Sequence, residues 1–153
     1  MAGPDTAGVL APPPAIFATA FVAGWLLGRV LPWPILPAAI AFWAGFVPGI
    51  AALAIAVAAW REMRRARTAV SPYTPSTALV RTGPFAYSRN PLYVALILLS
   101  LGLSLLVNTL WCVLLLPAMV VLRRGVIARE EAYLQRCFGE DYRLYCATTR
   151  RWL

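Results

Sequence analysis

Residues 91–122 read PLYVALILLSLGLSLLVNTLWCVLLLPAMVVL and contain no charged side chain. A second charge-free run covers residues 30–60. About 20 apolar residues in a helix cross the hydrocarbon core of a bilayer, so each run is long enough to span a membrane. The chain has 153 residues, of which 61% are hydrophobic and 13% charged. A soluble domain of this size could not bury both runs, so we predict a single all-α integral membrane domain over residues 1–153.

Two spans are expected in the first part of the chain. The first covers residues 15–31 and the second residues 37–60, separated by the helix-stopping turn Leu31-Pro32-Trp33-Pro34. The dipeptide Pro48-Gly49 predicts a kink inside the second span. Residues 1–14 are rich in Ala, Gly and Pro, and we expect them to form a disordered lead-in.

The run at residues 91–122 predicts two further spans. As one helix it would measure roughly 48 Å, more than a bilayer crossing requires. Asn108-Thr109 is the clearest polar break near its middle. We therefore divide the run into helices over residues 91–107 and 110–122. Each is at or below the short end for spanning, so this hairpin is predicted either to cross or to lie tilted.

The positive charge predicts how the chain is oriented. All 14 basic residues are arginines, the net charge is +8, and there is no histidine. With four spans, every arginine except Arg29 falls on the same side as the loop at residues 61–89. By the positive-inside rule that side is the cytoplasm, which predicts a cytoplasmic-membrane protein with both termini cytoplasmic. Because the arginines flank apolar runs, the charge favours a membrane partner over nucleic acid.

Catalytic triads and metal sites that depend on histidine are excluded by the absence of that residue. The cysteines, Cys112, Cys137 and Cys146, fit neither a disulfide framework nor a metal-ligand spacing. We therefore predict no metal site.

The last part of the chain predicts a cytosolic amphipathic helix. At about 100° per residue, the helix over residues 123–138 places Glu130 within an apolar arc and Glu131 at its edge. The pair is either solvated and offset by neighbouring arginines or lines a pocket that takes a cation or an amino group. The apolar arc consists of Val126, Ile127, Tyr133, Leu134, Cys137 and Phe138, the opposite face of Arg129, Ala132 and Arg136, and the offsetting arginines would be Arg123, Arg124 and Arg129.

A second group of polar residues lies in the stretch TGPFAYSRNPLY at residues 82–93. Asn90 followed by Pro91 is a good helix N-cap followed by a good first helical residue, which would simply open the third span. Alternatively, Arg89 and the helix N-terminus form an anion site at the membrane edge, with Tyr93 in the first turn close to it.

In their order and spacing, these groups resemble the isoprenylcysteine carboxyl methyltransferase and phospholipid methyltransferase family. Its pattern is Arg-His-Pro-x-Tyr-x-Gly, a hydrophobic hairpin, a Glu-Glu pair and a Phe-Gly…Tyr…Tyr tail. This chain has the stretch from Arg89 to Ala95, then Glu130-Glu131, then Phe138-Gly139, Tyr142 and Tyr145. The resemblance covers residues 80–153. Asn90 stands where the family usually has His, and Ala95 where it usually has Gly.

The resemblance implies an S-adenosylmethionine site in this cytosolic half. Arg89 with Asn90 would hold the cofactor carboxylate. Glu130 or Glu131 would accept from its amino group or ribose hydroxyls, and either would be the base for an amine acceptor. The tyrosines that would face the sulfonium or the adenine are Tyr87, Tyr93, Tyr142 and Tyr145.

The methyl acceptor implied by the resemblance is lipid-like or prenyl-like and reaches the site from the bilayer at its cytosolic face. Three alternatives remain open at this point. A membrane reductase of the steroid-reductase type would use NADPH instead. A small transporter would need an acid inside a span, and none is present in the proposed spans. A non-catalytic membrane protein would follow if Asn90 marks a lost activity.

Overall fold

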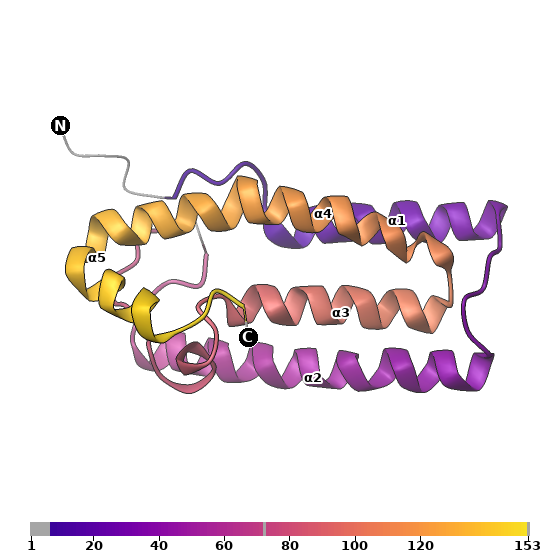
Figure 1. Ribbon diagram of the computed structural model, residues 1–153, viewed down its shortest axis with the longest axis horizontal. Helices are drawn as coiled ribbons and strands as arrows, with labels where there is room; N and C mark the ends of the chain where they lie inside the picture. Colours follow the sequence, from indigo (N-terminus) through magenta and orange to yellow (C-terminus); the bar gives the residue numbers. More distant parts are fainter. Residues whose placement is uncertain (1–6, 72, 153) are drawn as a thin grey trace.

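The structure, a computed structural model, describes residues 7–71 and 73–152, and this part of the chain is helical with no strand. Helices α1 (Pro13–Val30), α2 (Ala38–Arg65) and α3 (Pro91–Val107) lie side by side with a fourth helical segment (Figure 1). The all-α membrane fold expected from the sequence is therefore confirmed. Three segments are long and apolar enough to cross a membrane: Pro13–Val30, Ala38–Arg65 and Leu110–Thr148. The apolar α3 has 17 residues.

The fourth segment is where the helices differ most from the sequence prediction. The polar break at Asn108-Thr109 separates two helices as expected, but the second does not end at Leu122. The 3₁₀ helix η2 (Leu110–Leu114), α4 (Leu115–Leu122), the π-helical turn η3 (Arg123–Ile127) and α5 (Ala128–Thr148) follow one another directly. Nothing between Leu122 and Phe138 stops a helix, so the apolar span and the amphipathic tail are one long segment. In the same way, α2 continues through Pro48 to Arg65.

Helices α2 and α3 approach closely through glycines. A Cβ atom on Gly45 would lie 2.5 Å from the carbonyl oxygen of Gly102, and one on Gly102 would lie 2.6 Å from that of Gly45. Such close approach of backbones is typical of helix pairs in membranes, where small residues at the interface allow extensive van der Waals contact. This packing places the start of α3 beside the end of α2.

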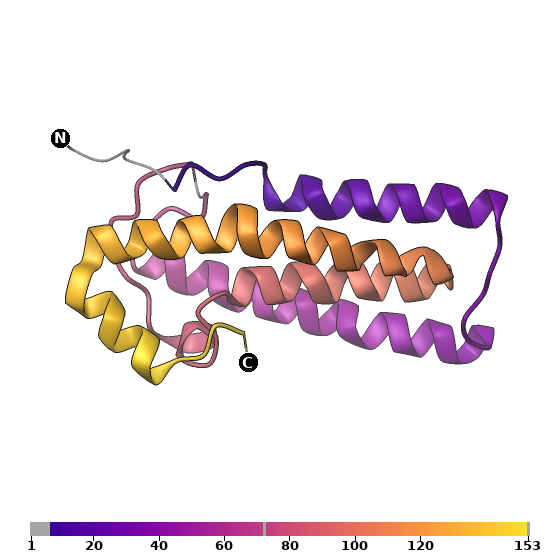
Figure 2. The same ribbon diagram turned by 45° about the horizontal axis from the view of Figure 1, so that its top comes forward.

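Gly139 folds the end of α5 back toward the bundle. Its φ of 51° and ψ of −118° lie in a region that only glycine adopts readily. The chain after Gly139 therefore turns back, and residues 140–148 lie at the left-hand end of the bundle, beyond the start of α3 (Figures 1 and 2). This turn brings Tyr142, Tyr145 and Cys146 to the same end of the molecule as Arg89.

The expected disordered lead-in covers residues 1–14, of which residues 1–6 lie outside the described residues. Its described part is packed rather than free. Ala7 and Val9 are buried, and the Leu10 amide donates to the Gly125 carbonyl at 3.3 Å. Helix α1 already begins at Pro13. Gly125 in the η3 turn allows this close approach, because a Cβ atom there would lie 2.8 Å from Leu10 Cδ1.

The two ends of the bundle are built differently. At the loop end, the α1–α2 connection (residues 31–37) meets the break between α3 and η2, and Asn108 joins them. Its Oδ1 accepts from the amides of Ile35 and Leu36, each at 3.1 Å, and its Nδ2 donates to the Leu36 carbonyl at 2.7 Å. The opposite end, where α2 ends and α3 begins, is the cavity end.

Candidate active site

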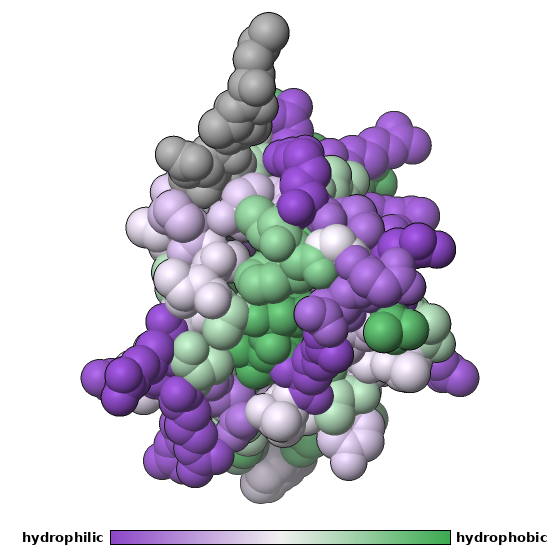
Figure 3. Space-filling model, turned by 90° about the vertical axis from the view of Figure 1, so that its left-hand side faces the viewer, coloured by the Kyte–Doolittle hydropathy of each residue, from purple (hydrophilic) through white to green (hydrophobic). Residues whose placement is uncertain are grey.

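A cavity of about 690 Å³ opens at the cavity end. Its walls come from α2, the loop after α2, the start of α3 and α5. Its volume is in the usual range for small-molecule and cofactor sites. Viewed from this end, apolar side chains gather at the centre and hydrophilic ones flank them (Figure 3). The predicted site residues that line it are Arg89, Asn90, Tyr93, Glu130, Glu131, Tyr142 and Tyr145.

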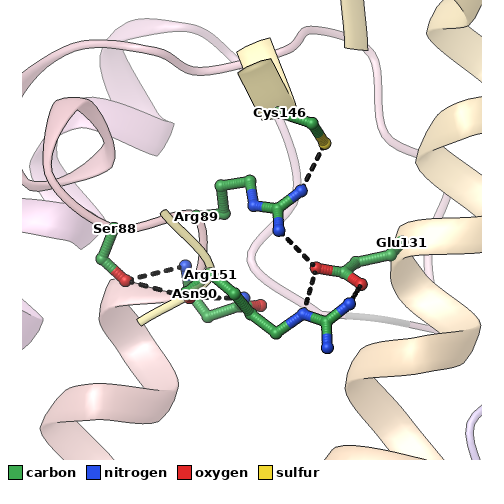
Figure 4. Close-up of polar contacts among 6 residues, drawn as sticks. All are labelled: Ser88, Arg89, Asn90, Glu131, Cys146 and Arg151. Atoms are coloured by element: carbon green, nitrogen blue, oxygen red, sulfur yellow. Dashed lines mark hydrogen bonds and ion pairs between the residues drawn. The ribbon is translucent and has the colours of Figure 1, made fainter. Parts of the chain in front are cut away.

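Glu131 is held by two arginines (Figure 4). Arg151 Nε donates to Glu131 Oε1 at 3.0 Å and its NH2 group to Oε2 at 2.6 Å, a two-pronged pair. The NH2 group of Arg89 lies 3.5 Å from Oε1, and the Glu131 side chain is 15% exposed. Hydrogen bonding to Glu131 raises the pKa of Arg151 above its ordinary value, so the guanidinium keeps its positive charge. Glu131 is therefore neither solvated nor offset by Arg123, Arg124 and Arg129.

Arg89 joins the third helix to the end of the fifth. Its NH1 group donates to the Sγ atom of Cys146, while NH2 faces Glu131 (Figure 4). Its Nε is buried and has no hydrogen-bond partner within the described part of the chain. A buried unpaired donor is rare in folded proteins and commonly marks a site that takes a further ligand.

Glu130 is paired with a hydroxyl instead of a cation. Tyr93 donates its hydroxyl hydrogen to Glu130 Oε2 at 2.7 Å. Within residues 7–71 and 73–152, Glu130 forms no ion pair, although it lines the cavity. Removing a carboxylate from water without a cation is costly. The position of Glu130 therefore suits a cationic or proton-donating ligand.

Asn90 occupies the N-cap position of α3 and Pro91 the first helical position, as expected, but the Asn90 side chain does not cap the helix. The side-chain Nδ2 of Asn90 instead donates to the Arg151 carbonyl at 3.0 Å, and its backbone amide donates to Ser88 Oγ at 3.1 Å. The first turn of α3 therefore has no side-chain cap, although Asn90, Pro91 and Leu92 line the cavity. Ser88 is 1% exposed, so this connection is internal.

The predicted tyrosines divide into two groups. Tyr142 and Tyr145 are buried and lie edge to face, with ring centroids 6.3 Å apart. Tyr145 also donates to the Phe85 carbonyl at 2.6 Å, which anchors the folded-back end of α5. Tyr87, by contrast, is 75% exposed and does not line the cavity. The sequence motif had suggested that Tyr87 faces the cofactor. It instead follows the 3₁₀ turn η1 (Gly83–Ala86) on the exposed surface.

Sequence reasoning missed three contributors to this site. Arg151 belongs to an Arg-Arg-Trp stretch typical of membrane anchors, Cys146 had no recognisable spacing, and the loop at residues 68–80 showed only turn residues. Tyr73 and Thr68 from this loop line the cavity. The predicted apolar face of α5 is otherwise present, except that Cys137 is exposed. The one sequence signal that could have predicted an arginine partner was the acidic pair, because carboxylates placed among apolar residues require cations from elsewhere in the chain.

Comparison with known proteins agrees with this geometry. The sequence model of a family described as "Phospholipid methyltransferase" matches residues 40–141, about two thirds of the chain. This chain belongs to the phospholipid methyltransferase family. The match contains Arg89, Asn90 and both glutamates but ends before Tyr142 and Arg151. Membership implies a methyltransferase enzyme in a membrane, which does not favour the reductase and transporter alternatives.

One curated relative adds a narrower match. An uncharacterized protein from Haemophilus influenzae is 40% identical over 63 residues, which are 40% of this chain and the whole of that protein. No solved structure matches the chain.

Proposed function

We propose that this protein transfers a methyl group from S-adenosylmethionine to a lipid-like or prenyl-like acceptor at the cytosolic face of the membrane. The observation that carries the proposal is Glu130, a carboxylate without a cation partner in the described structure that lines a cavity of about 690 Å³ beside Arg89. S-adenosylmethionine carries an amino group, a sulfonium and a carboxylate, so its charges complement these two side chains.

The described residues suggest how the cofactor would be held. Arg89 with Asn90, at the start of α3, would bind its carboxylate, and Glu130 would bind its amino group or ribose hydroxyls. Tyr142 and Tyr145 provide ring faces for the adenine or the sulfonium. When bound, the cofactor supplies an activated methyl group, and the transfer itself is an in-line displacement that depends mainly on positioning. Because Glu131 is committed to two arginines, Glu130 is the carboxylate left to take a proton from an amine acceptor.

The cavity walls support an acceptor that comes from the bilayer. Leu53 on α2 is 61% exposed and Leu99 on α3 is 42% exposed, yet both line the cavity. Both helices also carry the apolar surfaces expected to face lipid. A cavity that shares wall residues with this surface is accessible to a molecule with an acyl or prenyl chain without passage through water.

The orientation in the membrane is part of the same proposal. Arg29 ends α1 at the loop end, whereas the arginines of the 61–89 loop and of α5 lie toward the cavity end (Figure 1). We therefore place the cavity end in the cytoplasm by the positive-inside rule. Reporter fusions at Leu153 and Trp33 test this. A non-cytoplasmic signal from the Leu153 fusion would contradict it.

Calorimetry of the purified protein in detergent tests the cofactor assignment. We expect binding of S-adenosylmethionine and none of NADPH. Glu130→Gln should weaken binding at least about tenfold, the effect of losing a charge-assisted hydrogen bond. Glu140→Gln is the matched control, because Glu140 is 67% exposed and pairs only with Arg143. Wild-type binding of NADPH alone, or unchanged S-adenosylmethionine affinity in Glu130→Gln, would reject the assignment.

A further inference from the structure

Residues 150–152, hereafter the strap, lie across the start of α3 and are held there by three consecutive residues. The Arg89 amide donates to the Arg150 carbonyl at 2.9 Å. Both Ser88 Oγ, at 3.4 Å, and Asn90 Nδ2, at 3.0 Å, donate to the Arg151 carbonyl. Trp152 then packs against the hydrophobic core. The backbone of the strap is thus fixed by the same motif that lines the cavity (Figure 4).

The consequence of this attachment is the placement of the Arg151 side chain. Its guanidinium grips both oxygens of Glu131, at 3.0 and 2.6 Å, yet Arg151 itself does not line the cavity. A two-pronged arginine–carboxylate pair fixes the plane of the carboxylate as well as its distance. Glu131 in turn faces Arg89 at 3.5 Å. The side chain of Arg151 therefore reaches the cavity through its hydrogen bonds to Glu131.

We propose that Arg151 is a positioning residue for the methyltransferase site, and that Asn90 places it there. Arg151 fixes Glu131, and Glu131 together with Cys146 holds the Arg89 guanidinium in the orientation that receives the cofactor. This inference rests on the proposed function. It also gives Asn90 a defined task, the donation of one hydrogen bond to a backbone carbonyl. An amide performs this task as well as an imidazole N–H, so the replacement of the usual family His by Asn90 is compatible with activity.

Three variants in the full-length protein test the role of Arg151. Arg151→Gln should weaken S-adenosylmethionine affinity about tenfold, because Glu131 loses its two charge-assisted hydrogen bonds. Arg151→Lys should recover part of the affinity, since lysine restores the charge but not the fork. Arg150→Gln is the matched control, because the Arg150 side chain is exposed and forms no hydrogen bond or ion pair within the described residues. Its affinity should stay within about twofold of wild type, as for other exposed charges.

A double-mutant cycle distinguishes positioning from general stabilisation. If Arg151 acts through Glu131, the affinity of the Glu131→Gln, Arg151→Gln double variant should equal that of Glu131→Gln alone. Additive losses would overturn the proposal. Unchanged affinity in Arg151→Gln, or equal losses in Arg151→Gln and Arg150→Gln, would overturn it as well, while leaving the proposed function intact. A wild-type protein that binds no S-adenosylmethionine would overturn both.

Hydrogen exchange without cofactor tests the role of Asn90 separately. The Arg89 amide, which donates to the Arg150 carbonyl of the strap, should exchange faster in Asn90→Leu, whose side chain has the same branching but no donor, than in wild type. Asn90→His keeps a donor and should restore slow exchange. Wild-type exchange in Asn90→Leu, or fast exchange in both variants, would show that Asn90 does not hold the strap.

Discussion

The loop end and the cavity end of this bundle solve the same problem, the burial of polar groups, in opposite ways. At the loop end, Asn108 meets two amides and a carbonyl of the neighbouring connection, and Trp111 stacks on Trp33 with centroids 5.6 Å apart. Every ion pair found within residues 7–71 and 73–152 lies instead at the cavity end. Within the same residues, Glu130 has no cationic partner there, and the Nε of Arg89 has no hydrogen-bond acceptor.

This difference teaches which polar groups serve the fold and which serve a ligand. Neutral hydrogen bonds that satisfy both sides tie two loops together and leave nothing for a further molecule. Charged groups that line a cavity are different, because some of their hydrogen-bonding and ionic positions are not used by the chain and can bind a ligand. Substitutions at the loop end should therefore change stability alone, whereas those at the cavity end should change ligand affinity.

The largest effect is expected for Glu131→Gln, because it leaves two arginines without their shared partner. We expect S-adenosylmethionine affinity to fall by at least about tenfold while remaining measurable, and a destabilisation of about 2–3 kcal/mol, somewhat less than for a fully buried pair. In a chain of this length that lowers the melting temperature by about 4–12 °C. Thermal unfolding and calorimetry in the same detergent measure both effects. Glu140→Gln, at an exposed pair, should be close to wild type; full cofactor affinity in Glu131→Gln would contradict the comparison.

Asn108→Ala should be nearly as destabilising but silent in binding. It removes three hydrogen bonds, worth about 1 kcal/mol each, and places alanine at a φ of 54°. We expect a loss of about 2–3 kcal/mol in thermal unfolding, with unchanged cofactor affinity. Asn108→Gly relieves the backbone conformation without restoring the bonds, so its smaller loss separates the two causes. A tenfold change in affinity in either variant would break the distinction between the ends.

Gly102→Ala tests whether the close contact between α2 and α3 is required for stability. The added methyl would meet the Gly45 carbonyl at 2.6 Å, so the helices must separate, at a cost of about 1–3 kcal/mol that helix propensity offsets in part. Gly49→Ala is the control, since its Cβ would meet nothing within 4 Å. The melting temperature should fall in the first and rise slightly in the second. Equal behaviour would mean that the close contact is not required.

The smallest effect is expected for Tyr93→Phe. It removes the hydroxyl that donates to Glu130 at 2.7 Å and leaves the ring in place. The carboxylate then lacks the hydrogen bond that holds it in place, so cofactor affinity should fall by only about fivefold, the effect of about 1 kcal/mol. Titration calorimetry measures the change, with Tyr87→Phe as the exposed control. Complete loss of binding would instead assign Tyr93 a direct role.

Much of the fold was predictable because it follows from local patterns. Charge-free runs located the apolar helices, and Asn108-Thr109 marked the break between the third and fourth segments. The prediction that the fourth helix ends at Leu122 was wrong, because a change of composition from apolar to charged does not stop a helix. No local signal predicted the π-helical turn at Arg123–Ile127.

The candidate site was predictable in membership but not in connection. The motif and the acidic pair identified the residues around the cavity, with the exception of Tyr87. The contacts among these residues were not predicted: Arg89 faces Glu131, and the Asn90 side chain donates to a backbone carbonyl. These contacts join residues 42 and 61 positions apart, and periodicity within a single helix carries no information about them.

By itself, the sequence determined that the chain is helical, that it lies in a membrane and that its acidic pair is placed among apolar residues. Hydrophobicity and helical period act over one or two turns, so they are legible in a single stretch. Only the tertiary structure decided which arginine forms the two-pronged pair with Glu131 and which carboxylate lines the cavity without a cation. That choice depends on Gly139, whose backbone reversal brings residues 140–152 back onto the start of α3. A charge pairs with the partner that the packed helices bring within reach, whatever its distance along the chain.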